Sequence, residues 1–467
     1  MRAGLFFLAY LLVAVSCNSD ILVDSLEDVD DRASKLKDKI LNSKSCYELS
    51  GSVYYVSQSG SDANDGLSPR RAFKTLEKVN DCEFKPGDVV LFRRGDLWRG
   101  HIRTRDGVTY SAYGRGEKPK LYGSPFDAAV TGEWTETDVD DVYAFSIPVG
   151  PDVGTLVFDE GKSGCAYKVI QKMYPDSSLF HIETELPFND YHDITRDLDF
   201  FHDPNDSVIY LRCEKGNPAE VFKSIELNTY GHGFTVNGGD VKIDNFCIKY
   251  VGSHGIGAVA VRSLDVTNCE IGWIGGSIQF YKPLNPLRPV SPTRFGNGVE
   301  LWAGCGRYLV DHNYVYQVYD AGITNQFDGG SVAVVEENVT YSSNLVEDCV
   351  YSLEYFMSEP SDGNEERVMK DICVTDNIFR RTGYGWGTQR PNKGTCAIIK
   401  SWRHRNEAYG FEIKGNIFDR SKTVLMQVRA KDPHWLPYCH DNLYVMTGDM
   451  VLGETPEKSP EILVIQE

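Results

Sequence analysis

Positive charge is scarce in this sequence. Its 48 Lys and Arg residues are outnumbered by 67 Asp and Glu residues, which gives a formal net charge of −19 at pH 7. Because nucleic-acid phosphates need basic partners, this balance argues against a nucleic-acid-binding protein. Long apolar runs are scarce too. Beyond the N-terminal segment, none approaches the roughly 18 residues that a membrane-spanning helix requires.

Metal-binding patterns are missing as well. The 12 cysteines include no Cys-x-x-Cys pair and no zinc-type spacing. A loop with Asp62, Asn64 and Asp65 lacks the spacing of an EF-hand, so it predicts a turn rather than a calcium site. Six cysteines lie in or beside expected strands, and there we favour buried small side chains over a disulfide framework. These six are Cys247, Cys269, Cys305, Cys349, Cys373 and Cys396.

Glycine and aromatic residues, in contrast, are plentiful. The 43 glycines favour a turn-rich β protein, and 12% aromatic with 41% hydrophobic residues excludes a disordered chain. A length of 467 residues allows several domains, or one long repeat domain that carries an insertion.

Residues 1–17 have the features of a targeting segment. The basic Arg2 precedes an apolar run, Leu5–Val15, and small residues end it. One interpretation is an ordinary signal peptide, and the other is a lipoprotein signal with Cys17 as the lipidated first residue. We therefore expect a secreted, cell-surface or periplasmic protein, with a lipid anchor in the outer membrane under the second interpretation. Residues 18–52 predict a tether, or a short helix that covers the open end of a sheet.

Residues 53–125 predict a strand, a loop, a short helix and a further strand in succession. Val53–Gly66 begins with strand-forming residues and ends in Asp/Gly turns. Ala72–Val79 has one apolar helical face, and the Pro-Gly-Asp turn in Lys85–Asp96 leads into a hydrophobic strand. This opening resembles that of right-handed parallel β-helix proteins of the pectate-lyase-like superfamily.

The resemblance covers about residues 50–450. It continues in Gly298–Trp302, Tyr319–Gln326, Ser352–Phe356, Gly383–Pro391 and Asn416–Phe418. It implies an all-β, right-handed parallel β-helix with an N-terminal helical cap, from a secreted, carbohydrate-active branch. The superfamily includes hydrolases, lyases and non-enzymatic adhesins, so the fold alone does not assign an activity.

The repeat is interrupted once. Residues 126–223 contain alternating strand patterns, which predict an inserted small antiparallel β region whose contribution to any site stays open. Residues 224–467 predict the main coils, because Asn precedes an apolar pair at intervals of 23 to 45 residues. We expect these Asn side chains to stack as a structural ladder. They are Asn245, Asn268, Asn313, Asn344, Asn377, Asn416 and Asn442.

Three short runs, Gly298–Trp302, Gly322–Gln326 and Ser352–Phe356, predict neighbouring strands of successive coils. Because side chains alternate along a strand, each run contributes one residue to an inward row and one to each of two outward rows. The inward row is Val299, Ile323 and Leu353. The first outward row, extended in both directions, is Gly257, Glu300, Thr324, Glu354, Lys400 and Met426, and the second is Trp302, Gln326, Phe356 and Trp402.

Three carboxylates on this face are the candidate catalytic groups. Coils stack about 4.8 Å apart, so Glu300 and Glu354 would lie roughly 9–10 Å apart at the backbone. Flexible side chains could bring the two carboxyl groups within ~6.5–9.5 Å of each other, the separation found in inverting glycosidases. Asp320 could instead lie about 5 Å from either glutamate, which would fit the separation in retaining enzymes. Mutual repulsion among clustered acids raises at least one pKa, as a general acid requires.

Candidate substrate-binding residues surround these acids. Flat aromatic rings pack against sugar faces and polar neighbours bind hydroxyls. Arg390 is a candidate partner for the carboxylate of an acidic sugar, and Asp328 is a loop acid near the strands. The full set is Trp302, Gln326, Asp328, Tyr355, Trp386, Gln389, Arg390, Lys400 and Trp402.

The sequence therefore favours a glycoside hydrolase that uses Glu300, Asp320 and Glu354 on a polysaccharide or oligosaccharide. The first alternative is a polysaccharide lyase, in which Lys400, Arg390 or bound Ca²⁺ would neutralise a uronate. The second is a non-catalytic glycan-binding or adhesion protein. We expect a monomer with no cofactor and no metal, apart from Ca²⁺ under the lyase alternative.

Overall fold

The computed structural model describes residues 23, 25–45, 47–130, 133–146, 149, 152–173, 179–181, 184, 186–203, 207–282, 291–361, 363–390, 395–402 and 407–465. The predicted targeting segment, residues 1–17 with Cys17, lies outside these residues. Among the helices in those ranges, none is long and apolar enough to span a membrane.

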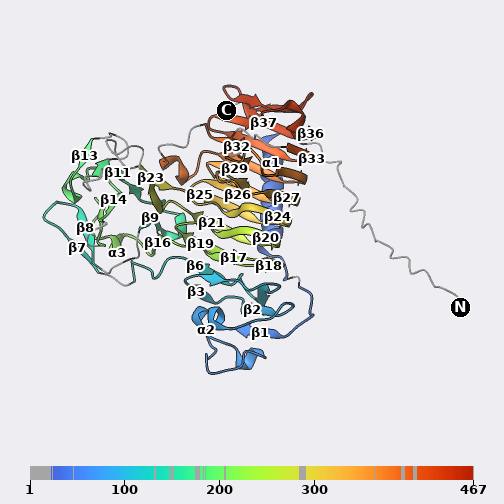
Figure 1. Ribbon diagram of the computed structural model, residues 1–467. Coiled ribbons are helices and arrows are strands. Elements are labelled where there is room, and N and C mark those ends of the chain that lie inside the picture. The colour runs from blue at the N-terminus through green and yellow to red at the C-terminus, as the bar shows by residue number, and fades with distance from the viewer. Residues whose placement is uncertain are drawn as a thin grey trace.

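The chain winds into a parallel β-helix, a stack of coils whose strands pair with those of the coils above and below (Figure 1). The fold class predicted from the sequence is thus confirmed. One long sheet has 17 strands and covers two sides of the stack. In chain order these are β1 (Val53–Val56), β2 (Val89–Arg93), β4 (Ile102–Arg103), β5 (Thr109–Tyr113), β17 (Phe234–Asn237), β18 (Val241–Asp244), β20 (Ile256–Thr267), β24 (Val299–Asp311), β26 (Ala321–Phe327), β27 (Val334–Ser342), β29 (Tyr351–Met357), β30 (Arg367–Thr375), β32 (Ala397–Ser401), β33 (Glu407–Lys414), β35 (Val424–Gln427), β36 (Tyr438–His440) and β38 (Val451–Glu454).

A second sheet of 12 strands forms the remaining side of the stack. Its strands are β3 (Leu97–Arg99), β6 (Lys120–Tyr122), β9 (Val153–Phe158), β16 (Ile225–Thr229), β19 (Cys247–Val251), β21 (Glu270–Ile274), β25 (Tyr314–Val318), β28 (Leu345–Glu347), β31 (Ile378–Thr382), β34 (Ile417–Ser421), β37 (Leu443–Thr447) and β39 (Glu461–Ile465). Side chains from both sheets fill the interior with one continuous hydrophobic core. Neighbouring coils therefore hold the outward-facing residues on a rigid support.

The predicted register is confirmed over the central strands. Val299 pairs with Ile323, which pairs with Leu353, and all three are fully buried. Thr324 pairs with Glu354 in the outward row. The prediction for Met426 is wrong: it pairs with Ile399 and lies in the core, while Gln427 takes the outward place beside Lys400. A shift of one residue exchanges the two faces of a strand, and the pattern around Met426 is apolar on both.

An asparagine ladder runs along one bend of the stack. Five of the seven predicted residues stack in it, and each side-chain oxygen accepts hydrogen bonds from the coil before. These five are Asn313, Asn344, Asn377, Asn416 and Asn442. Asn245 and Asn268 lie one position earlier and adopt positive φ angles of 66° and 54°. Asparagine tolerates that left-handed conformation better than most residues, so these two shape the turn instead.

Replacing one ladder residue should destabilise the fold strongly. The Asn344 oxygen accepts from the backbone and side-chain nitrogens of Asn313, and its amide donates to Val310 O and Asn377 Oδ1. Asn344→Ala leaves buried polar groups without partners, at an expected cost of about 2–4 kcal/mol in unfolding free energy. Urea unfolding followed by circular dichroism measures the change. An unchanged midpoint would contradict the ladder's structural role.

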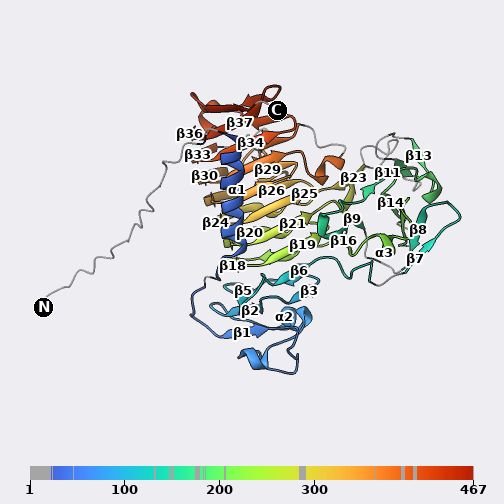
Figure 2. The same ribbon diagram turned by 180° about the vertical axis from the view of Figure 1, so that it is seen from behind.

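Two helices pack on the stack in different places. The helix α2 (Leu76–Asp81) covers the N-terminal end, where Leu76 and Val79 join the core. The helix α1 (Leu26–Leu41) does not cover an open end, as residues 18–52 were expected to do; it runs along the outside of the second sheet (Figure 2). Its buried Val29, Ala33 and Ile40 pack on residues from β25, β28, β31, β34 and β37.

The interrupted repeat forms a lobe beside the stack (Figure 1). A mostly antiparallel sheet consists of β7 (Trp134–Glu136), β8 (Val142–Phe145), β10 (Tyr167–Lys168), β14 (Asp199–His202) and β15 (Ile209–Arg212). A smaller one consists of β11 (Ile170–Met173), β12 (Leu179–His181) and β13 (Pro187–Phe188), and the short helix α3 (Pro218–Val221) leads back. The strand β9 joins the lobe to the stack by antiparallel pairing with β16.

The cysteines in the described part of the chain form no disulfide. Five of the six singled out in the sequence are buried, and Cys373 is half-buried. The interpretation as small filling side chains is confirmed for those five.

Candidate active site

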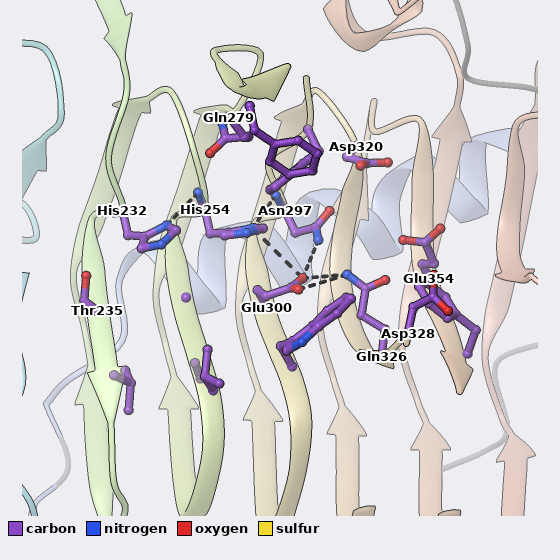
Figure 3. A pocket seen from close by; sticks show the side chains of 18 of the residues that line it. His232, Thr235, His254, Gln279, Asn297, Glu300, Asp320, Gln326, Asp328 and Glu354 are labelled. Atoms are coloured by element: carbon purple, nitrogen blue, oxygen red, sulfur yellow. Dashed lines mark hydrogen bonds and ion pairs between the residues drawn. The ribbon is translucent and has the colours of Figure 1, made fainter. Parts of the chain in front are cut away.

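A pocket of about 900 Å³ lies on the outer face of the central coils. Its floor comes from β17, β20, β24, β26 and β29, which lie side by side in the sheet (Figure 3). The hairpin of β22 (Ile278–Lys282) and β23 (Ser291–Arg294) adds Gln279 and Phe280 to the wall. All three candidate carboxylates line the pocket, together with Trp302 and Trp402. The spacing of coils thus brings together side chains that are far apart in sequence.

Glu300, near the middle of the floor, is held by three neutral donors. Thr324 Oγ1 donates to its carboxylate over 2.8 Å, Gln326 Nε2 over 2.9 Å, and the Asn297 amide donates as well. The side chain is almost completely buried, and burial raises the pKa of Glu300, whereas the donors favour its charged form. These bonds fix the direction of the carboxylate without a cationic partner.

Glu354 has a different environment. It lies on β29 and accepts a hydrogen bond from the indole N–H of Trp402. Burial, and then the negative charge of nearby Asp320, raises the pKa of Glu354 to about 8. Arg390 and the Trp402 donor oppose this rise. A carboxyl group with this pKa carries its proton at neutral pH, which is the state that a general acid needs.

Asp320 immediately precedes β26 and forms an ion pair with Arg390. Burial raises the pKa of Asp320, and the adjacent guanidinium limits the rise by favouring the charged form. The site thus combines a carboxyl that holds its proton with one whose negative charge is supported. Arg390 was expected to hold the carboxylate of an acidic sugar, but its charge is already engaged by Asp320.

Eight of the twelve predicted site residues line the pocket. They are Glu300, Trp302, Asp320, Gln326, Asp328, Glu354, Arg390 and Trp402. The strands supply most of them, since outward positions on successive coils face the same side. Asp328 is exposed at the end of β26, where the chain leaves the sheet.

The other four predicted residues lie elsewhere. Tyr355 points inward and packs on Phe411, because it alternates with the outward Glu354. Trp386 is buried, and its indole donates to Gln317 O. The remaining two are Gln389, which donates to Ala166 O in the lobe, and Lys400, whose ammonium lies 4.2 Å from the Trp402 ring centroid and contacts Gln427.

The pocket residues that sequence reasoning missed include a row of three polar side chains. His232, His254 and Asn297 occupy the same position on three successive coils (Figure 3). Each precedes a glycine at the start of an outward strand, and that repeated pair is a signal in the sequence that would have found them. Within the described residues, no group of three or more His, Cys, Asp or Glu side chains is placed to hold a metal ion.

Comparison with known proteins gives likenesses of limited extent. No family model matches the chain. A lacto-N-biosidase of Bifidobacterium longum subsp. longum is 40% identical over 82 residues, which is 15% of this chain and only 5% of that protein.

Among solved structures, XylC in complex with xylose is 11% identical, with a TM-score of 0.45, over 86% of this chain and 70% of that one. The GH136 lacto-N-biosidase from Eubacterium ramulus is 12% identical, with a TM-score of 0.38, over 94% of this chain and 70% of that one. A rhamnogalacturonan lyase is 11% identical, with a TM-score of 0.34, over 89% and 86%. Such scores carry no conclusion about the chemistry of this pocket.

Proposed function

We propose that this protein is a glycoside hydrolase that cleaves a neutral glycan in the pocket. The observation that carries the proposal is geometric: three buried carboxyl groups, those of Glu300, Asp320 and Glu354, line one pocket, where burial and the charge of Asp320 raise the pKa of Glu354. Names among the similar proteins, which include a lacto-N-biosidase and a structure titled XylC with xylose, support action on carbohydrate in general.

In this proposal Glu354 donates its proton to the oxygen of the leaving sugar. Cleavage of the glycosidic bond develops positive charge on the anomeric carbon, which the negative charge of Asp320 stabilises. Water then forms the new C–O bond to this carbon and releases a proton, so that one water is consumed for each bond broken. Arg390 favours the ionised form of Asp320 against the effect of burial, and the charge of Asp320 in turn raises the pKa of Glu354. Pairs of acids whose environments push their pKa values apart are the usual basis of such a division of roles.

Glu300 has a third role. Its oxygens already accept from Asn297, Thr324 and Gln326, so its direction is fixed. A fixed carboxylate accepts hydrogen bonds from sugar hydroxyls at little entropic cost. Trp302 and Trp402 supply flat surfaces for the sugar rings.

The charges in the pocket favour hydrolysis over elimination. A lyase needs a cation or metal to neutralise the uronate carboxylate next to the abstracted proton. Of the described lining residues, four are acids, and Arg390 is paired with one of them. Such a pocket repels an anionic glycan and suits a neutral one. We also propose export of the enzyme, because residues 1–17 would deliver it to a glycan outside the cytoplasm.

Isotope labelling tests the reaction class. The protein is incubated in H₂¹⁸O with neutral oligosaccharides and, separately, with oligogalacturonates, and the products are analysed by mass spectrometry. Hydrolysis should release products that carry one ¹⁸O from water, from neutral substrates only. Unlabelled unsaturated products from oligogalacturonates would mean a lyase, and binding without products from any glycan would mean a binding protein.

A further inference from the structure

The end of the pocket farthest from Glu354 contains two histidines with no role in the proposed reaction. His232 and His254 lie on neighbouring coils, their rings 5.0 Å apart at the centroids and nearly parallel at 25°. Figure 3 shows them in line with Asn297, beside Glu300. Side chains at this position therefore form a short row that leads to the carboxylate.

Backbone hydrogen bonds fix the tautomer of both rings. The backbone N–H of His254 donates to His232 Nδ1 over 3.2 Å, and that of Asn297 donates to His254 Nδ1 over 3.0 Å. An Nδ1 atom that accepts a hydrogen bond carries no proton, so the proton of a neutral ring is on Nε2. Burial lowers the pKa of each histidine to about 3, and both rings are neutral across the physiological range.

This arrangement leaves the two Nε2–H groups as donors for a ligand. Both histidines line the pocket, and among the described residues neither Nε2 atom has a hydrogen-bond partner. Gly257 occupies the outward row beside Glu300, and a Cβ atom there would lie 3.2 Å from the His232 ring. The missing side chain keeps space open in front of the His232 ring.

The surroundings indicate which ligand would fit. Phe295 stacks on His254 at 5.4 Å between centroids, and the rim carries the half-exposed Phe280 and Tyr230. The described lining residues at this end, from β17, the start of β20 and the hairpin, include no charged side chain. Aromatic walls with neutral donors suit an uncharged sugar ring.

We propose that this end of the pocket is a sugar subsite, in which His232 and His254 donate Nε2–H hydrogen bonds to oxygens of a neutral sugar unit. The subsite rests on the proposed hydrolase function. It implies that the bound substrate extends along the stack axis, past Glu300 and away from Glu354. His232 and His254 determine specificity and take no part in bond cleavage.

The chain itself suggests the variants that test this subsite. Asn297 occupies the equivalent position one coil later, where its Oδ1 accepts from the backbone N–H of Ala321 over 2.9 Å. His232→Asn and His254→Asn therefore keep an acceptor for the backbone and remove the imidazole ring together with its Nε2–H donor, since the shorter amide cannot place a donor at the position of the ring tip. His434→Asn, at a residue with 93% of its side chain exposed and outside the pocket, is the matched control.

Binding is measured on an array of neutral oligosaccharides and oligogalacturonates, in the inactive Glu354→Gln background. We expect the background protein and the control to bind neutral oligosaccharides, and the double His→Asn variant to bind them at least about tenfold more weakly, since each neutral hydrogen bond contributes roughly threefold to tenfold. Equal binding by the double variant, or no binding to neutral glycans by the background protein, would overturn the subsite.

Two further measurements separate the subsite from the hydrolase. Two-bond ¹H–¹⁵N spectra of the histidine rings should show Nε2–H tautomers that do not titrate between pH 5 and 8; Nδ1–H protons would contradict the subsite. With Glu354 restored, the double variant should have a KM for neutral oligosaccharides at least about tenfold above that of wild type, whereas His434→Asn should match wild type in both KM and kcat. Failure of the wild type to cleave any glycoside would sink the hydrolase while the spectra and the array still report on the subsite.

Discussion

Replacing Glu354 with glutamine should lower kcat on natural glycans by about 10³-fold, in line with the loss of a general acid. Glutamine keeps the size of the side chain and can still accept from the Trp402 indole, but it has no proton to donate. Substrate affinity should change little. Aryl glycosides with good leaving groups need little protonation, so the variant should cleave them at close to the wild-type rate.

The chain offers a matched control in Glu336. It is another fully buried glutamate, and burial raises the pKa of Glu336 to about 8 as well. Its carboxyl lies in the core, where it accepts from the Asn325 amide, and it does not line the pocket. Glu336→Gln should leave kcat within about threefold of wild type. If both variants lose activity equally, Glu354 is not the proton donor and the loss reflects disturbed packing.

Stability gives a second readout for the same two residues. A glutamate in an unfolded chain has a pKa of about 4.3, whereas Glu354 and Glu336 have raised values of about 8 in the folded protein. Between these values the unfolded chain loses protons that the folded protein keeps, so each glutamate destabilises the fold progressively as the pH rises to about 8. Each Glu→Gln variant should therefore gain melting temperature relative to wild type from pH 5 to pH 8. A difference in melting temperature between variant and wild type that stays constant from pH 5 to pH 8 would contradict the raised pKa values.

Asp320→Asn should have an effect of similar size, for a different reason. The variant removes the negative charge that faces the developing positive charge of the sugar, and we expect kcat to fall by about 10³-fold even on aryl glycosides. The loss of activity on aryl glycosides distinguishes Asp320→Asn from Glu354→Gln, which should keep that activity. If Glu300→Gln lost this activity while Asp320→Asn kept it, Glu300 would be the second catalytic carboxylate.

The same variant should shift the pH profile. After burial, the charge of Asp320 is the main cause of the raised pKa of Glu354. Without that charge, and with Arg390 left next to Glu354, the pKa of Glu354 should fall. The residual activity of Asp320→Asn should therefore decline at a lower pH than that of wild type. A basic limb at the same pH in both proteins would contradict this coupling.

Much of the fold and of the carboxylate cluster could be predicted from the sequence, because both depend on alternation along strands. Glu300, Thr324 and Glu354 face one way since each follows an inward Val, Ile or Leu. The same rule failed at Met426, where apolar residues on both faces leave the register open. It also could not show that α1 lies along the outside of the stack, since one apolar helical face indicates burial without naming the surface that covers it.

The polar contacts of the site were less predictable, because they join loops whose paths follow no period. Arg390 lies in the segment that follows β31, and only the folded chain brings it to Asp320. Trp386 and Gln389, in that same segment, turn toward the stack and the lobe instead of the pocket. The histidine pair stayed hidden since a histidine acquires a role only through its neighbours, here the backbone of the next coil.

The most direct test of the central claim is the pH dependence of kcat/KM for an aryl glycoside of moderate leaving-group ability, in wild type and Glu354→Gln. Wild type should lose activity as the pH rises through about 8, the pKa of Glu354, because the acid has then lost its proton. In the variant, kcat/KM should be low and should not fall further as the pH rises through about 8. An identical basic limb in both proteins would show that another group is the acid, and the mechanism proposed here would be wrong.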